Sequence, residues 1–148
     1  MRLIKKYPQA EVAWRPVEAH PKSEEPEHIP YADLAVMGAL FARDHAIDLS
    51  VYNDRMFEMY FTKHFSVDDP LALASAVAPL GIEKVEFINA LTNGAYAHAL
   101  AEANNYAYKT NKIWAVPAFI FGDKRLDSVE GVGVTETQLS NFLRECYG

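Results

Sequence analysis

A proline placed between a predicted helix and a short apolar run constrains the fold of this chain most. Pro117 opens the segment Ala118-Phe-Ile-Phe121, which stops at the turn pair Gly122-Asp123. Because proline has no N–H to donate to a sheet, it belongs at the start or edge of a strand. The Val116–Pro117 bond at such a corner is a candidate for the cis form. The sequence therefore predicts a β-hairpin, with strands over residues 118–121 and about 124–128.

Apolar spacing predicts a largely helical region before this corner. Helical periodicity indicates helices over residues 31–46, 50–65, 71–80, 83–91 and 95–110. Asp69-Pro70 has the residue types that favour the start of a helix, an acid followed by proline. Thr135, with Gln138 three residues later, has the pattern of a capping box and begins a last predicted helix.

The N-terminal part of the chain predicts less regular structure. Residues 2–7 have the character of the last turns of a helix, ended by Tyr7-Pro8. Residues 10–18 alternate between apolar and polar side chains, with Val12 and Trp14 on one face, which predicts a strand. Prolines and glutamates between residues 20 and 30 predict an extended connection. The order of strand, helices, two strands and helix predicts an α/β fold.

Composition limits the classes of partner. The 148 residues fit one domain, and 50% of them are apolar. A net charge of −6 argues against a nucleic-acid-binding surface and against a basic patch that would attract a membrane. No apolar run approaches the roughly 20 residues of a membrane helix, and no apolar signal core follows the basic first residues. We therefore expect a cytoplasmic protein.

The residues that most often carry redox or metal chemistry are few. Cys146 is the only cysteine, so the chain can form no internal disulfide. At the end of the last helix the helix dipole raises the pKa of a thiol, and we expect Cys146 to be inert; the alternative is an intermolecular disulfide. None of the five histidines forms an i, i+4 helical pair (20, 28, 45, 64, 98), and the sequence predicts no metal site.

Three motifs resemble one family when they are taken in order. Residues 12–21, Val-Ala-Trp-Arg-Pro-Val-Glu-Ala-His-Pro, are similar to its second strand and exit. Leu40-Phe41-Ala42 resembles part of its helical insertion, and Ala115-Val-Pro-Ala-Phe-Ile-Phe121 resembles its proline corner. The chain is identified by these motifs as a relative of the DsbA-like thioredoxin-fold family. It is most similar to the branch of FrnE-type proteins and 2-hydroxychromene-2-carboxylate isomerases.

The resemblance implies one DsbA-like thioredoxin domain over residues 1–148, with thioredoxin-like core elements at 10–20 and 113–148 and a helical insertion at 31–110. In the family, a first strand and a Cys-Pro-x-Cys helix start precede the segment that matches Leu3–Tyr7. Neither the first strand nor the Cys-Pro-x-Cys motif has a counterpart in this sequence, so we expect an N-terminally truncated version of the fold. The open position in the sheet would be filled by direct pairing of 11–18 with 118–121, or by a second subunit in a homodimer.

The resemblance also implies a function and a site. Family members perform thiol–disulfide exchange or glutathione-dependent isomerisation, but without the dithiol we expect no redox activity in this form. Val116 and Pro117 would bind the backbone of a peptide or of a small-molecule thiol such as glutathione, with Trp114 as one wall. The alternative is a non-catalytic, dimeric binding or scaffold protein. A third reading is an unrelated helical domain with a small hairpin.

Two further groups of side chains have both a binding and a structural interpretation. The polar residues just before the corner are candidates to hydrogen-bond a ligand there: Asn104, Asn105, Tyr106, Tyr108 and Lys109. An aromatic series lines either an apolar pocket or the core: Tyr52, Phe57, Tyr60, Phe61 and Phe65.

Overall fold

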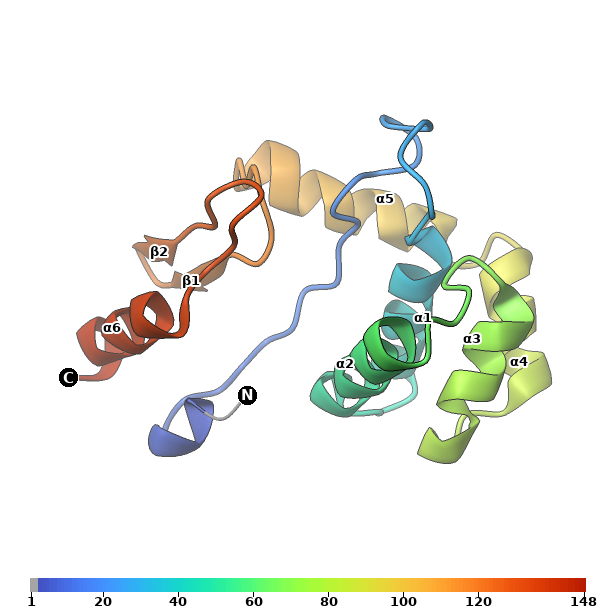
Figure 1. Cartoon of the computed structure of the whole chain (residues 1–148), viewed down its shortest axis with the longest axis horizontal. Helices are drawn as coiled ribbons and strands as arrows, with labels where there is room; N and C mark the ends of the chain where they lie inside the picture. Colours follow the sequence, from blue (N-terminus) through green and yellow to red (C-terminus); the bar gives the residue numbers. More distant parts are fainter. Residues whose placement is uncertain (1–2) are drawn as a thin grey trace. The chain divides into compact units, whose positions relative to one another are not determined.

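The computed structural model describes residues 3–148, and in these residues the protein is mixed α/β and mostly helical (Figure 1). Its six α-helices are α1 (Asp33–Asp44), α2 (Leu49–Phe57), α3 (Pro70–Val77), α4 (Lys84–Thr92), α5 (Ala97–Asn105) and α6 (Glu136–Tyr147). Its two strands are β1 (Phe119–Phe121) and β2 (Lys124–Leu126). Shorter helical turns are η1 (Ile4–Lys6), η2 (Glu58–Thr62), η3 (Ala78–Leu80) and η4 (Tyr106–Thr110).

The chain divides into two compact units. Unit 1 combines Met1–Ala13 with Tyr106–Gly148, and unit 2 is Trp14–Asn105. Unit 2 therefore holds α1 to α5, and unit 1 holds the hairpin and α6. The prediction for residues 2–7 falls partly on Arg2, which lies outside the described residues, and the remainder is the single turn η1.

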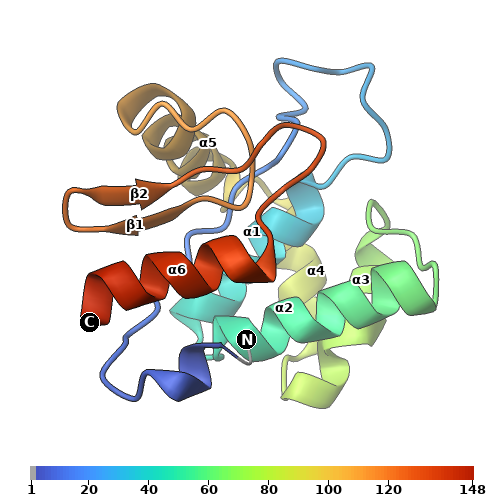
Figure 2. The same cartoon turned by 60° about the vertical axis from the view of Figure 1, so that its left-hand side comes forward.

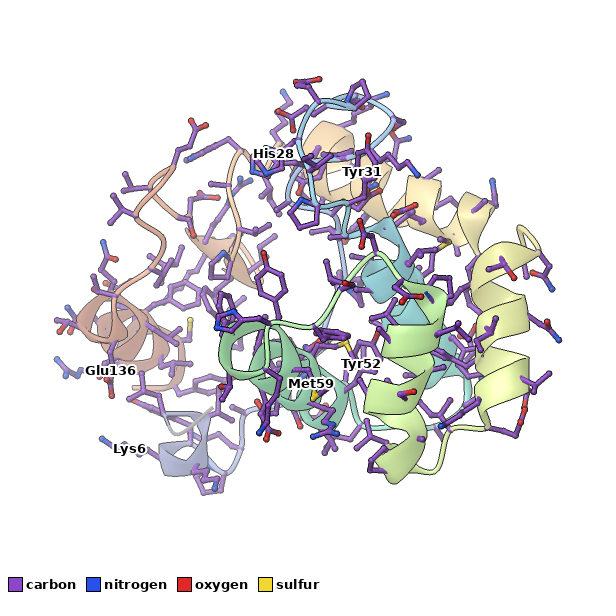
Figure 3. All side chains as sticks on the ribbon, turned by 45° about the vertical axis from the view of Figure 1, so that its right-hand side comes forward. Lys6, His28, Tyr31, Tyr52, Met59 and Glu136 are labelled. Atoms are coloured by element: carbon purple, nitrogen blue, oxygen red, sulfur yellow. The ribbon has the colours of Figure 1, made fainter. Side chains whose placement is uncertain are left out.

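The core of unit 2 forms where helices α1 to α4 pack together. Phe41, Tyr52, Leu73 and Phe87 are among the buried side chains that α1, α2, α3 and α4 contribute. Figure 3 shows Tyr52 among these helices, and its hydroxyl donates to the Ala35 carbonyl at 2.7 Å. The missing side chain of Gly38 makes room for this packing, since a Cβ there would lie 2.4 Å from Tyr52 Oη. The helical spacing of the apolar residues thus produces a buried helical core.

Capping residues set the helix boundaries largely as the sequence predicts. The Asp69 side chain accepts from Leu71 N at the start of α3, which has proline in its first turn. The helical segment after α3 ends at Gly81, whose φ of 86° is left-handed. Thr135 and Gln138 form the expected capping box at the start of α6. The helix predicted from Ser50 begins slightly earlier, because Asp48 is its N-cap.

The hairpin of unit 1 is a two-stranded antiparallel sheet with Phe119 opposite Leu126 and Ile120 opposite Arg125. Gly122 has a φ of 60° and is the first residue of a two-residue turn, which is the position where a type II′ turn takes glycine. Alternate residues point to opposite faces of the sheet. Phe119 and Leu126 accordingly pack against the apolar side of α6, which lies alongside the hairpin (Figure 2).

The strand predicted over residues 10–18 is wrong. This segment has no strand in the structure, and the hairpin is the only sheet formed by residues 3–148. Val12 is exposed, whereas Trp14 packs on the core of unit 2, so the alternation does not produce one buried face. A strand needs a hydrogen-bonded neighbour, and alternation alone does not supply one. The expected pairing of 11–18 with 118–121 is therefore not observed.

Candidate functional site

The approach to the predicted corner is a tight turn after η4. Both the backbone N–H and the side-chain Nδ2 of Asn111 donate to the Tyr106 carbonyl, at 3.0 and 2.8 Å. Lys112 follows with a φ of 52°, in the left-handed region that residues other than glycine rarely occupy. The turn ends the helical segment and leads the chain to Trp114.

Arg125 of β2 holds this turn in place. Its Nε donates to both carboxylate oxygens of Asp127, at 2.7 and 2.8 Å. Its Nη1 donates to the Asn111 carbonyl, and its Nη2 donates to the Lys112 carbonyl at 3.1 Å. The centre of the Trp114 ring lies 5.4 Å from the guanidinium carbon. Because the charge of Arg125 is paired and its donors meet protein oxygens, its role is to support the corner.

Ser128 joins the two sides of the corner. It is only 2% exposed, its hydroxyl donates to the Pro117 carbonyl, and its own carbonyl accepts from Trp114 Nε1 at 3.0 Å. Burying a hydroxyl is favourable only when it is hydrogen-bonded, and Ser128 meets this condition. The sequence analysis did not identify Arg125 or Ser128. Both act over 11 or more residues of separation, and no local pattern marks such contacts.

The three predicted site residues do lie together at this corner. The Val116–Pro117 bond is cis, as the sequence suggested; the Ile29–Pro30 bond is also cis, which the sequence analysis did not anticipate. Trp114 is 63% exposed and Val116 is 38% exposed. Among residues 3–148, no hydrogen bond is made by the Val116 backbone N–H or carbonyl, whereas the Pro117 carbonyl is taken by Ser128. The corner therefore presents one unpaired stretch of backbone beside apolar side chains.

Such a corner can bind a ligand, and the carboxylate and hydroxyl beside it are already hydrogen-bonded within it, Asp127 to Arg125 and Ser128 to the Pro117 carbonyl. The one thiol of the chain, Cys146, is in the last turn of α6. Desolvation raises the pKa of the Cys146 thiol, and the positive charge of Lys124 opposes this only in part. A raised pKa disfavours the thiolate, which is the reactive form.

Two groups of other candidates from the sequence include residues with structural partners. His20 contacts Glu25 at 3.0 Å and stacks on His28, which lies with Tyr31 in the loop before α1 (Figure 3). In residues 3–148 no three or more His, Cys, Asp or Glu side chains are grouped as metal ligands. Asn104 does not point to a ligand, because it uses its side-chain amide on Glu18.

The core interpretation of the aromatic series on α2 and η2 holds only for part of it, and the pocket interpretation stays a prediction. Tyr52 is in the core, whereas Phe57 and Phe61 are exposed and lie 6.1 Å apart between ring centroids. Tyr60 contacts Phe61 with ring centroids 5.0 Å apart. These three aromatic side chains form a surface cluster on unit 2.

No protein-family model matches the sequence, and no curated protein is significantly similar to it. The resemblance to DsbA-like proteins therefore stays a prediction. Within the part of the chain that the structure describes, no helix has the length and apolar character needed to cross a membrane.

Proposed function

We propose that this chain is a DsbA-like thioredoxin-fold protein that binds an extended peptide backbone at the Trp114–Pro117 corner without catalysing disulfide exchange. The proposal rests mainly on Val116, whose backbone N–H and carbonyl find no hydrogen-bond partner within residues 3–148 although the corner around it is firmly held. In the family that the sequence resembles, the backbone before this proline binds substrate or glutathione.

The surroundings of Val116 suit an extended ligand. A backbone that runs past it can exchange hydrogen bonds with its N–H and carbonyl, as in strand addition. The exposed ring of Trp114 offers an apolar surface to one ligand side chain. Arg125 and Ser128 already hold that ring, so little further ordering is required on binding.

The affinity expected from these contacts is modest. Two backbone hydrogen bonds contribute about 1–3 kcal/mol in total, and partial burial of a tryptophan adds about 1–2 kcal/mol. Association costs at least about 4 kcal/mol, so these contacts leave a net of at most about 1 kcal/mol, and we expect weak binding with a dissociation constant on the order of 100 mM or higher.

The binding test is an NMR titration of the ¹⁵N-labelled protein with two probes, an uncharged tripeptide Ala-Val-Ala with blocked ends and reduced glutathione. We expect concentration-dependent shifts of the Val116 amide and the Trp114 indole signals with the tripeptide. Shifts with glutathione but not with the tripeptide would instead favour the glutathione-dependent isomerase lineage. If neither probe moves these signals at about 100 mM, the peptide-binding proposal is wrong.

Trp114→Ala should weaken binding of the tripeptide about three- to tenfold, because it removes the apolar wall. Val85→Ala is the matched control, since Val85 is a similarly exposed apolar residue on α4 of unit 2. Reduction of insulin disulfides, measured by turbidity, tests the second part of the proposal. We expect no turnover above the uncatalysed rate, because Cys146 has neither a resolving partner nor a lowered pKa. Turnover that matches a dithiol enzyme would refute it.

A further inference from the structure

The outer edge of β1 carries unpaired backbone groups next to exposed apolar side chains. The two-residue turn places Phe121 and Lys124 opposite each other, and residues beside such a turn exchange hydrogen bonds. Hydrogen bonding alternates along an antiparallel strand, so the N–H and carbonyl of Ile120 point away from β2. No other strand is formed by residues 3–148, and this edge therefore has no strand partner there.

The residues along this edge would be expected to attract another strand. Ile120 is 50% exposed and Phe121 is 42% exposed. Ala118 to Gly122 contains no charged residue, although charges are a common means of protecting an edge from pairing. Pro117 closes the edge at one end, because it has no N–H to donate. The available length is therefore about five residues.

The sequence of this edge is symmetric about Ile120. If two copies pair antiparallel around a two-fold axis at Ile120, Phe119 of each copy faces Phe121 of the other. Ala118 of each copy then faces Gly122 of the other, and Ile120 faces itself. Large residues thus meet large residues and small ones meet small ones, which is the self-complementarity that a two-fold interface requires.

We propose that β1 pairs with β1 of a second copy of this chain and forms a continuous four-stranded antiparallel sheet. The two Ile120 residues exchange two backbone hydrogen bonds across the axis. Phe119 and Phe121 lie on the face that packs on α6, where Phe121 contacts Tyr147 at 4.9 Å between ring centroids. Each pair of facing phenylalanines extends that apolar layer between the two copies.

The charge of each unit and the small area of the interface determine how strong this dimer is expected to be. By sequence, unit 2 has 14 acidic and 6 basic residues, whereas unit 1 has 6 acidic and 8 basic residues, so pairing through unit 1 avoids the strongest like-charge repulsion. Five residues per strand bury less than the roughly 1,200 Å² typical of a stable complex. We therefore expect a weak, concentration-dependent dimer. The inference is independent of the proposed function, because it uses the backbone of residues 118–122 and not that of Val116.

Disulfide trapping is suited to a weak dimer. In a Cys146→Ser background, Ile120→Cys places two thiols opposite each other across the axis, with Cα atoms about 5.5 Å apart. This separation lies within the range of normal disulfides. Mild oxidation should give a covalent dimer at least about tenfold faster than Val132→Cys in the same background, because pairing raises the effective concentration of the thiols. Val132 is a stringent control, since it is more exposed and belongs to the same unit.

Sedimentation velocity over a concentration series supplies the second measurement. Ile120→Lys should raise the dimer dissociation constant at least about tenfold, since it removes apolar contact and places like charges opposite each other. Val132→Lys should leave it unchanged, and circular dichroism should show both variants folded. The proposal is overturned if both Cys variants cross-link at the same rate, if neither does, or if Ile120→Lys dimerises as the parent chain does.

Discussion

Replacing Asn104 by alanine tests how far one side chain stabilises unit 2. Asn104 Oδ1 accepts from the backbone N–H of Glu18 at 3.0 Å, and Nδ2 donates to the Glu18 carboxylate at 2.9 Å. Glu18 is only 3% exposed, and its carboxylate also accepts from Lys22 N at 3.0 Å. A neutral hydrogen bond contributes about 0.5–1.5 kcal/mol, and one to a charged group about 1.5–3 kcal/mol.

We therefore expect Asn104→Ala to lower the free energy of unfolding by about 2–3 kcal/mol, near the lower end of the sum, because Asn104 is partly open to water. For a chain of this size, that corresponds to a fall in the thermal midpoint of about 4–12 °C. Urea unfolding followed by far-UV circular dichroism measures the change directly, provided that the slope of the transition stays constant.

Asn105→Ala is a closely matched control for this experiment. Asn105 is the next residue of α5, its side chain is exposed, and no side-chain hydrogen bond joins it to the rest of residues 3–148. Both variants gain the same helix propensity from alanine, so the difference between them isolates the contacts with Glu18. A difference smaller than about 0.5 kcal/mol would show that these contacts do not stabilise the fold.

Two further variants probe other parts of unit 2. Gly38→Ala should lower the urea midpoint, because overpacking costs about 1–3 kcal/mol and the new Cβ would lie 2.4 Å from Tyr52 Oη and 2.9 Å from Phe87 Cζ; an unchanged or higher midpoint would refute the predicted clash. The hydrogen bond to the Phe41 carbonyl, and then the contact with Glu86, raise the pKa of His45. The stabilisation that protonated His45 provides is therefore complete below the unfolded pKa near 6.5, and it disappears as the pH rises through the higher folded pKa. The urea midpoint should therefore fall more between about pH 6 and pH 8 in the parent chain than in His45→Gln. An equal fall in both proteins would contradict a stabilising role of protonated His45.

Local patterns predicted most helices and the hairpin because their causes lie within a few residues. Asp69 before Pro70 and Thr135 before Gln138 satisfy N–H groups of their own helices, so their sequences alone indicate the boundaries. Gly122 marks the hairpin turn in the same local way, because its φ of 60° suits glycine. Each of these interactions is complete within four residues, and tertiary packing does not change it.

The incorrect and missed predictions concern features whose causes lie far apart in the sequence. The alternation of residues 10–18 suggested a strand, but whether a strand forms depends on a neighbour elsewhere in the chain. The predicted site residues Trp114, Val116 and Pro117 are together at one corner, yet the residues that hold the corner, Arg125 and Ser128, were missed. Their contacts depend on how the hairpin folds back, which no short pattern shows.

The hydrogen bonds between Glu18 and Asn104 also connect two points that are 86 residues apart in the chain. They lie close to the first and last residues of unit 2, so the polypeptide enters and leaves this helical bundle at neighbouring places. Segments with adjacent ends can be acquired, exchanged or circularly permuted with little disturbance of the flanking chain. The bundle is thus a topologically self-contained segment of the chain.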